Sequence, residues 1–296
     1  MRLLLATRPM FLTASVLPVL VGTAWGYRMA GELDLTALLL AIATLVLVHA
    51  SANVLNDVFD DIGGTDAVNE SRIFPYTGGS RFIQDALLSR RQMAIWGVIL
   101  LLLGVGFGAA LVAQKGVVFL LFGLVGITLA LLYSMPPVQL NARGLGELAV
   151  AAAFGVLPVT GAAWLQSGLS IFGALVLSLP VACWVMAILL ANEVPDREAD
   201  RSTGKHTLVV RLGVVRSRGL YFIIQALSLL FMALAVSLGM LKSWALLLPA
   251  LLLPVAAYAA LGLSAGPERL KRSIELTLTI HMIGGLWLAV WALVPA

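Results

Sequence analysis

The chain has 296 residues, of which 60% are hydrophobic and 11% are charged, and its formal net charge is +4. Soluble domains carry about 25% charged residues, so this composition excludes two soluble domains and indicates a polytopic membrane protein. The basic residues occupy short loops instead of one continuous stripe, so a nucleic-acid partner is not expected.

Nine apolar windows recur along the chain, each close to the ~20 residues that a membrane-spanning helix needs. They cover residues 10–29, 35–58, 93–113, 116–134, 146–166, 170–194, 218–240, 243–263 and 273–293. Because the connections at 114–115 and 241–242 are short, eight or ten spans are the alternatives. No linker interrupts the pattern, so residues 1–296 are expected to form one all-α domain of about nine transmembrane helices in the lipid bilayer.

The second window ends in an acidic cluster. Offsets of zero, three, four and seven residues place four polar side chains on one helical face: Asn53, Asn56, Asp57 and Asp60. Asp66 follows after a pair of glycines, where the helix should give way to a loop. Crowded carboxylates repel one another, and Mg²⁺ relieves that repulsion by taking oxygen ligands. A solvated helix end that merely caps the span is the alternative.

The loop that follows this cluster is rich in glycine and flanked by Arg72 and Arg81. Paired glycines allow backbone amides to approach an anion, and the flanking arginines add positive charge. A plain turn is the alternative interpretation.

A second acidic cluster follows the sixth window. Asn192, Asp196 and Asp200 are four residues apart and share a helical face, although Pro195 is expected to kink or end the helix. A loop containing Lys205 and Arg211 comes next. The matching design of the two clusters hints at an internal duplication.

The distribution of basic residues predicts the orientation in the membrane. Of the 19 lysines and arginines, sixteen lie at the N-terminus or in loops after even-numbered windows, and three, Arg28, Lys115 and Lys242, lie in the other loops. Basic loops face the cytoplasm. We therefore expect an integral protein of the cytoplasmic (inner) membrane, if the source is bacterial, with both acidic clusters at the cytoplasmic face.

Two acidic clusters at one membrane face suit a diphosphate attached to a long hydrocarbon. The carboxylates would hold Mg²⁺, and basic side chains would balance the remaining phosphate charge: Arg72, Arg81, Lys205 and Arg211. If the diphosphate is allylic, the same groups stabilise it as a leaving group. The resulting cation needs apolar or aromatic walls until an electron-rich acceptor captures it.

These motifs resemble those of the UbiA superfamily of intramembrane prenyltransferases. The first family motif, Asn-Asp-x-x-Asp followed by a third acid, is matched by Asn56, Asp57, Asp60 and Asp66. The second, Asp-x-x-x-Asp, is matched by Asp196 and Asp200, and the glycine-lysine segment that follows is matched by residues 204–213. Residues 8–9, 133–134 and 143–147 extend the resemblance over nearly the whole chain.

The resemblance implies a nine-helix bundle around a central cavity open to the bilayer, with Mg²⁺ between the two motifs. It assigns metal and diphosphate binding to five aspartates: Asp57, Asp60, Asp66, Asp196 and Asp200. Among these, Asp57, Asp60, Asp196 and Asp200 are the expected catalytic residues. The amides of Asn53, Asn56 and Asn192 are expected to support the diphosphate.

The spacing of the third acid resembles the branch of this family that prenylates 1,4-dihydroxy-2-naphthoate in menaquinone synthesis. Glu193 and Pro195 depart from that branch, which often has Asn and Arg there. Sister branches offer 4-hydroxybenzoate, geranylgeranylglyceryl phosphate, chlorophyllide or haem as alternative acceptors. A secondary transporter is the alternative from another class. The expected partners are thus a polyprenyl diphosphate and an aromatic acceptor.

Tyr133 and two histidines are candidates for contact with the cation or the acceptor. Tyr133 ends the fourth window, and His49 lies one turn before Asn53 on the same face. His281 is a polar side chain at membrane depth in the last window, where such residues often face a cavity. A packed, hydrogen-bonded histidine is the alternative for His49.

Overall fold

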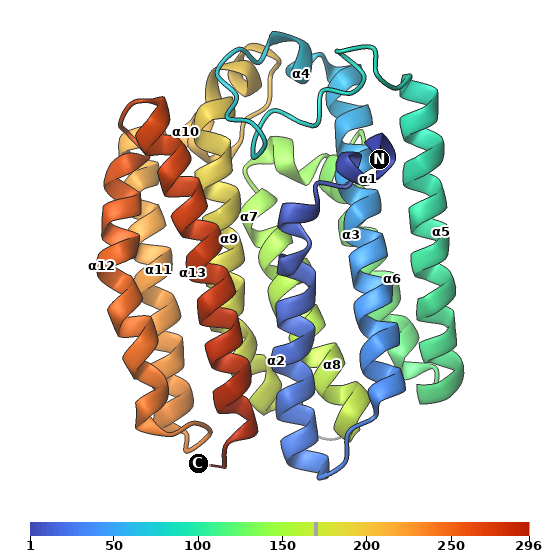
Figure 1. Cartoon of the computed structure of the whole chain (residues 1–296), viewed down its shortest axis with the longest axis vertical. Coiled ribbons are helices and arrows are strands. Elements are labelled where there is room, and N and C mark those ends of the chain that lie inside the picture. The colour runs from blue at the N-terminus through green and yellow to red at the C-terminus, as the bar shows by residue number, and fades with distance from the viewer. Residues whose placement is uncertain (169–170, 296) are drawn as a thin grey trace.

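Apolar helices packed side by side form the body of the molecule in the computed structural model, which describes residues 1–168 and 171–295 (Figure 1). Within this part of the chain, eight helical segments are long and apolar enough to cross a membrane, and no β-strand is present. They cover Pro9–Ala30, Leu35–Gly63, Arg90–Lys115, Gly146–Ser167, Phe172–Ser202, Val214–Ser237, Ser243–Gly262 and Pro267–Leu293. The fourth predicted span is the shorter helix α6, Val118–Ser134, with 17 residues. The predicted all-α membrane fold is therefore confirmed.

The helix labels of Figure 1 correspond to these segments. They are α2 (Thr13–Ala30), α3 (Leu35–Gly63), α5 (Arg90–Lys115), α7 (Gly146–Val150), α8 (Leu157–Ser167), α9 (Phe172–Ser202), α11 (Val214–Ser237), α12 (Leu247–Gly262) and α13 (Pro267–Leu293). Short helices lie in the connections: α1 (Arg2–Ala6), α4 (Thr65–Val68) and α10 (Leu208–Leu212).

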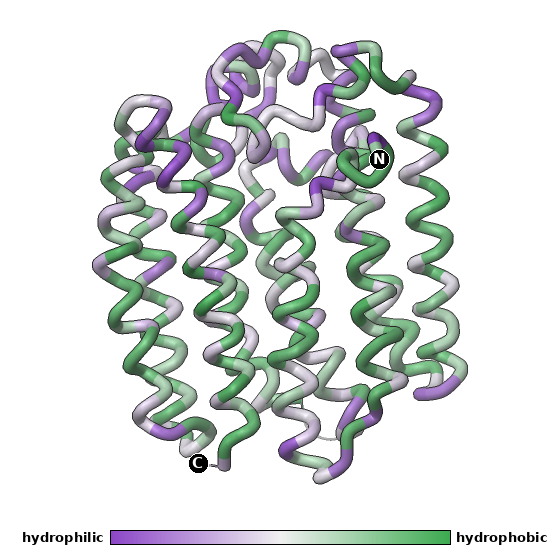
Figure 2. The backbone as a smooth tube through the Cα atoms, viewed as in Figure 1, coloured by the Kyte–Doolittle hydropathy of each residue, from purple (hydrophilic) through white to green (hydrophobic). Residues whose placement is uncertain are grey.

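The two ends of the bundle differ in polarity. The N-terminus lies at the end that carries α4 and α10, and the C-terminus lies at the opposite end (Figure 1). Hydrophilic residues gather in the loops of the N-terminal end, whereas the helix bodies are mainly hydrophobic (Figure 2). An odd number of crossings places the two termini on opposite sides, so this arrangement agrees with nine spans.

Small residues allow several helices to approach closely. A Cβ atom on Gly22 of α2 would lie 2.2 Å from the carbonyl oxygen of Val159 in α8, and one on Gly155 would lie 2.6 Å from Ala182 in α9. Membrane helices gain little from hydrophobic contact with each other, so close van der Waals packing at small residues is what stabilises their association.

Two helix ends position the acidic clusters. Helix α3 ends at Gly63, and Gly64 adopts a left-handed φ of 79°, so the chain leaves the helix where the glycine pair predicted. Of the two outcomes expected at Pro195, a kink or an end of the helix, the end is excluded, because helix α9 continues through Pro195 to Ser202. The consequence is that Asp196 and Asp200 remain on one helix, one turn apart.

A π-helical segment, Ala151–Val156, interrupts the span formed by α7 and α8. Such segments widen a helix locally and change the direction of its side chains. Phe154 lies in this segment, and the centroid of its ring is 4.4 Å from that of His49 in α3. Both residues line the central cavity.

Candidate active site

A cavity of about 470 Å³ runs through the bundle between α2, α3, α5, α6, α8 and α9. Its wall includes Asp60 and Ala41 of α3, which the helical rise separates by about 28 Å. The hydrocarbon core of a bilayer is ~30 Å thick. The cavity therefore extends across most of the membrane, from a polar end at the aspartate motifs to an apolar end among α5, α6 and α8.

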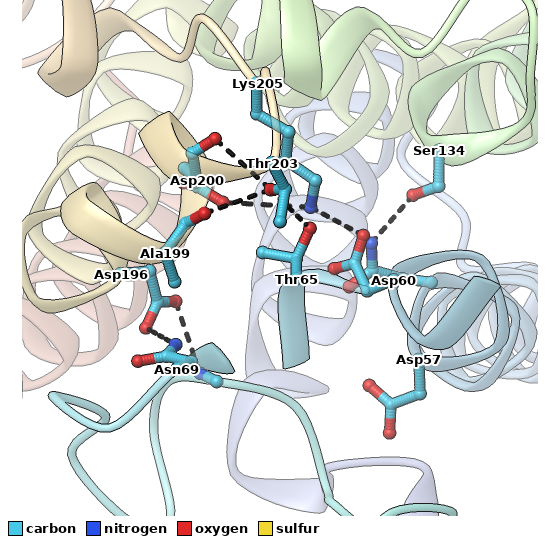
Figure 3. Close-up of polar contacts among 12 residues, drawn as sticks. Asp57, Asp60, Thr65, Asn69, Ser134, Asp196, Ala199, Asp200, Thr203 and Lys205 are labelled. Atoms are coloured by element: carbon cyan, nitrogen blue, oxygen red, sulfur yellow. Dashed lines mark hydrogen bonds and ion pairs between the residues drawn. The ribbon is translucent and has the colours of Figure 1, made fainter. Parts of the chain in front are cut away.

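Lys205 joins the two aspartate motifs. Its Nζ atom lies 2.6 Å from Asp60 Oδ1 and 3.8 Å from Asp200 Oδ1 (Figure 3). Beside this contact the hydroxyl groups of Thr65 and Thr203 are hydrogen-bonded at 3.0 Å. The pKa of Lys205 is raised, because the attraction of Asp60 and Asp200 outweighs the opposing effect of burial. The buried ammonium group of Lys205 therefore bridges the aspartates of α3 and α9.

The glycine-rich loop after α4 closes over both motifs. Asn69 Nδ2 donates to Asp196 Oδ1 at 2.7 Å (Figure 3). The Gly78 amide donates to Asp196 Oδ2 at 3.2 Å. The Ser80 amide donates to Asp57 Oδ2 at 3.0 Å. Gly78 and Gly79 have φ values of 69° and 70°, which glycine adopts without strain. The backbone amides predicted to face an anion thus face the carboxylates of the motifs.

Arg8 is a site residue that the charge pattern alone did not single out. Its guanidinium group forms an ion pair and hydrogen bond with Asp57, and it lines the cavity. Burial by itself would lower the pKa of Arg8, but the nearby Asp57 and Asp66 raise it above its ordinary value. Only the resemblance of the Arg8-Pro9 pair to the family pointed to this position.

The three asparagines of the predicted site have different partners. Asn53 Nδ2 donates to the carbonyl oxygen of Thr7 at 2.9 Å, and Asn56 Nδ2 donates to Ser134 Oγ at 2.9 Å. Asn192 also lines the cavity, and its Oδ1 atom is buried without a hydrogen-bond partner among the described residues. Asn53 and Asn56 thereby fasten α3 to the N-terminal segment and to α6.

Three of the four predicted basic residues lie outside the lining of the cavity. The guanidinium carbon of Arg72 is 6.0 Å from the centroid of the Phe74 ring. Arg81 donates to the carbonyl oxygen of Asp66 at 2.9 Å. Arg211 donates to the carbonyl oxygens of His206 and Arg143 at 2.9 and 2.8 Å. As placed here, Arg81 and Arg211 fasten loops, and Lys205 is the one of the four that enters the cavity.

Tyr133 and His49 line the cavity, whereas His281 does not. His49 Nδ1 is hydrogen-bonded to Ser15 Oγ at 2.8 Å, so the ring is held in one orientation. His281 is fully buried in α13. His281 is thus enclosed between α13 and its neighbouring helices and lies outside the cavity lining.

The donor set at the polar end fits a divalent cation. Buried oxygen atoms without a hydrogen-bond partner in the described part of the chain belong to cavity-lining residues: Asp66 Oδ2, Asn69 Oδ1 and Asn192 Oδ1. Burial and repulsion by Asp60 and Asp57 raise the pKa of Asp66 to about 8. A hard cation would satisfy these oxygens and remove the repulsion.

The carboxylates are spread out, however. Across residues 1–168 and 171–295, no three His, Cys, Asp or Glu side chains converge closely enough to hold an ion as they stand. Asp57 is occupied by Arg8 and the Ser80 amide. Asp60, Asp66, Asp196 and Asp200 line the cavity and are the residues that would hold Mg²⁺.

Known proteins resemble this chain in sequence and in fold. The pattern of the UbiA prenyltransferase family matches residues 15–294. The 1,4-dihydroxy-2-naphthoate octaprenyltransferase of Escherichia coli (strain K12) is 32% identical over 96% of this chain and 94% of that protein. UbiA prenyltransferase domain-containing protein 1 of Homo sapiens is 30% identical over 73% of this chain and 62% of that protein.

Two solved structures share the fold. The UbiA homolog from Archaeoglobus fulgidus bound to DMAPP and Mg²⁺ superposes with a TM-score of 0.67 at 16% identity, over 98% of this chain and 99% of that one. The apo UbiA homolog from Aeropyrum pernix K1 gives a TM-score of 0.65 at 20% identity, over 94% and 97%.

Fold and site together define an integral membrane protein built around an intramembrane cavity with a carboxylate-rich polar end. The chain belongs to the UbiA prenyltransferase family. The family predicted from the two aspartate motifs, and the resemblance to its naphthoate branch, are confirmed.

Proposed function

We propose that the protein transfers a polyprenyl group from its diphosphate to 1,4-dihydroxy-2-naphthoate, with loss of the acceptor carboxylate as CO₂. The observation that carries this proposal is the shape and charge of the cavity. Both aspartate motifs border its polar end, and apolar side chains line the rest of its length. A charged diphosphate with a long hydrocarbon tail matches both parts. The choice of acceptor rests on the Escherichia coli relative.

The residues at the polar end would bind the diphosphate and prepare it to leave. When bound, Mg²⁺ would neutralise diphosphate charge and so stabilise the leaving group. Lys205 lies between Asp60 and Asp200, close enough to exchange a carboxylate partner for a phosphate oxygen. Arg8 adds a second buried positive charge. The loop over the motifs limits the access of water to this region.

The residues deeper in the cavity would contain the allylic cation. Tyr133 and Phe154 present aromatic rings to the cavity, and aromatic faces stabilise a nearby cation by about 0.5–2 kcal/mol each. The apolar walls beyond them would take up the prenyl tail and exclude water. Capture by the acceptor, not by water, follows from that exclusion.

The test is product identity. Membranes containing the protein would be given 1,4-dihydroxy-2-naphthoate and allylic diphosphates of several lengths, with and without a chelator, and the products identified by mass spectrometry. We expect a decarboxylated prenylnaphthoquinol that is lost when Mg²⁺ is removed. If a parallel reaction gives prenylated 4-hydroxybenzoate and no naphthoate product forms, the protein is still a prenyltransferase but 1,4-dihydroxy-2-naphthoate is not its acceptor.

A further inference from the structure

A second group of carboxyl side chains lies deeper in the cavity than the aspartate motifs. Glu193 is one turn of α9 before Asp196, about 4.5 Å nearer the middle of the membrane, and it lines the cavity. Glu147, at the start of α7, lies against it from the neighbouring helix. Both side chains are buried: Glu193 is 7% exposed and Glu147 is 2% exposed. The proposed function gives neither of them a role.

This group lacks hydrogen-bond donors. Glu193 accepts one hydrogen bond of 3.3 Å, from the Val209 amide. The carboxyl group of Glu147 lies against that of Glu193 and has no other hydrogen-bond partner among the described residues. Oδ1 of Asn141, which also lines the cavity, has no partner among them either. Every one of these atoms is an oxygen that can accept. Because a buried acceptor without a donor is destabilising, the site favours a ligand that brings donors of its own.

We propose that Glu193, backed by Glu147 and flanked by Asn141, binds a phenolic hydroxyl group of the acceptor and takes up its proton during prenyl transfer. This inference rests on the proposed function and deepens it, because it states which part of the acceptor faces the protein here. A hydroxyl group supplies the missing donor. A carboxylate in the same place would be repelled by Glu193, so the hydroxyl group, and not the carboxylate beside it on the ring, is the group that faces Glu193.

The position of Glu193 suits the chemistry. The reactive carbon of an allylic diphosphate lies next to the phosphate, so an acceptor that attacks it must sit about one helical turn below the aspartates. Proton loss from the hydroxyl pushes its electron pair into the ring. The ring carbon that carries the carboxylate, next to this hydroxyl group, then forms the bond to the allylic carbon, while the allylic C–O bond breaks and its electrons leave with the diphosphate.

The second half of the reaction returns the proton. The ring is a ketone at this stage and still carries its carboxylate. The bond between the ring and the carboxylate then breaks as CO₂ leaves. Its electron pair returns to the ring and restores the aromatic oxyanion. Glu193 then gives back the proton, so the carboxyl group is regenerated and no other reactant is required.

Three titratable groups interact electrostatically with Glu193: Glu147 from α7, Tyr133 from α6 and Asp200 on its own helix. Lys205 is paired with Asp200. A change in pH acts on all of them, so the test needs a variant that separates Glu193 from its neighbours.

Glu193→Gln keeps the shape of the side chain and removes the proton acceptor. We expect acceptor kcat/KM to fall about 100-fold or more, as for loss of a general base, while KM for the polyprenyl diphosphate stays within about twofold of wild type. Activity should recover as pH rises, because an acceptor hydroxyl that ionises in solution needs no base. Glu198→Gln is the matched control, because Glu198 is exposed on the same helix; it should behave as wild type.

Three results would overturn the inference. One is a Glu193→Gln rate within threefold of wild type, and another is a loss that raising the pH does not relieve. If Glu193→Gln does not accumulate, Glu193→Asp is the second variant, because it keeps the carboxyl group with a shorter reach. Its acceptor kcat/KM should fall about tenfold with an unchanged pH profile. The third contradicting result is no fall in this variant. A wild-type protein that makes no naphthoate product would reject the proposed function as well, so the two failures are distinguishable.

Discussion

At the scale of single residues, three aspartates of the two motifs are held by donors from other parts of the chain. Arg8 and the Ser80 amide hold Asp57, Lys205 holds Asp60, and Asn69 with the Gly78 amide holds Asp196. Buried carboxylates are costly unless their charge is compensated. The donors therefore keep the site folded before substrate binds, and a cation with a diphosphate would take over part of that task.

Removal of one negative charge from either motif should abolish most activity. Asp60→Asn and Asp196→Asn keep the side-chain shape but weaken cation and diphosphate binding, so we expect kcat/KM to fall by about 100-fold or more. Prenyl transfer by purified protein is the measurement. Asp85→Asn, which changes a half-exposed loop aspartate, is the control and should retain full activity. Unchanged rates in the two motif variants would show that the motifs do not form the site.

Gly79→Ala should damage the site through Asp66. A Cβ atom on Gly79 would lie 2.5 Å from Asp66 Oδ2, and the residue also has a left-handed φ of 70°. Gly31→Ala is the matched control: Gly31 has a φ of 78° and nothing within 4 Å of its Cβ position. The backbone strain is common to both, about 1–2 kcal/mol, so a loss of activity confined to Gly79→Ala reports the displaced carboxylate. Equal activity in the two variants would contradict this explanation.

At the scale of helices, the wall of the cavity depends on close contacts at small residues. Helices α2 and α8 meet at Gly22 and Gly26, whose Cβ positions would lie 2.2 Å and 2.5 Å from carbonyl oxygens of α8. Backbone atoms cannot move aside as a side chain can, so a larger residue there must separate the helices.

Gly22→Val should therefore destabilise the bundle, by about 1–3 kcal/mol for overpacking of a filled interior. The readout is the apparent melting temperature in detergent, which we expect to fall. Gly106→Val is the control, because Gly106 lies on α5 with nothing within 4 Å of its Cβ position. A melting temperature lowered equally by both variants would point to helix propensity instead of the contact between α2 and α8.

At the scale of the whole molecule, both motif loops lie at one end of the bundle with the N-terminus, and the C-terminus lies at the other (Figure 1). The bias of sixteen basic residues against three, out of 19, leads us to propose that this end faces the cytoplasm.

Accessibility to a thiol reagent that cannot cross the membrane tests this orientation. Ser71→Cys and Ser202→Cys place an exposed thiol at the end with the motifs, and Ser243→Cys places one at the opposite end. In intact cells we expect labelling at position 243 and protection at 71 and 202, while all three react after lysis. The native Cys183 is buried and should give little background. The reverse pattern of labelling would invert the proposed topology.

The sequence by itself determined the class of fold, the family and the two motifs. These follow from local rules: an apolar window of ~20 residues must become a helix in lipid, and side chains three or four residues apart share a helical face. Asp57 and Asp60, or Asp196 and Asp200, therefore fall together whatever the rest of the chain does. The end of α3 also follows from a local rule, because the left-handed φ at Gly64 is one that glycine adopts readily.

Only the tertiary structure decided which distant residues meet those motifs. Asn69 and Arg8 reach the aspartates from segments without a periodic pattern. Lys205 turns inward to Asp60, whereas Arg211 faces loop carbonyls. Glu147 and Glu193 are far apart in the sequence, and they become a pair only when α7 packs on α9. Spacing along one helix fixes a face, but the contact between two helices depends on how their surfaces pack, and that is a property of the whole bundle.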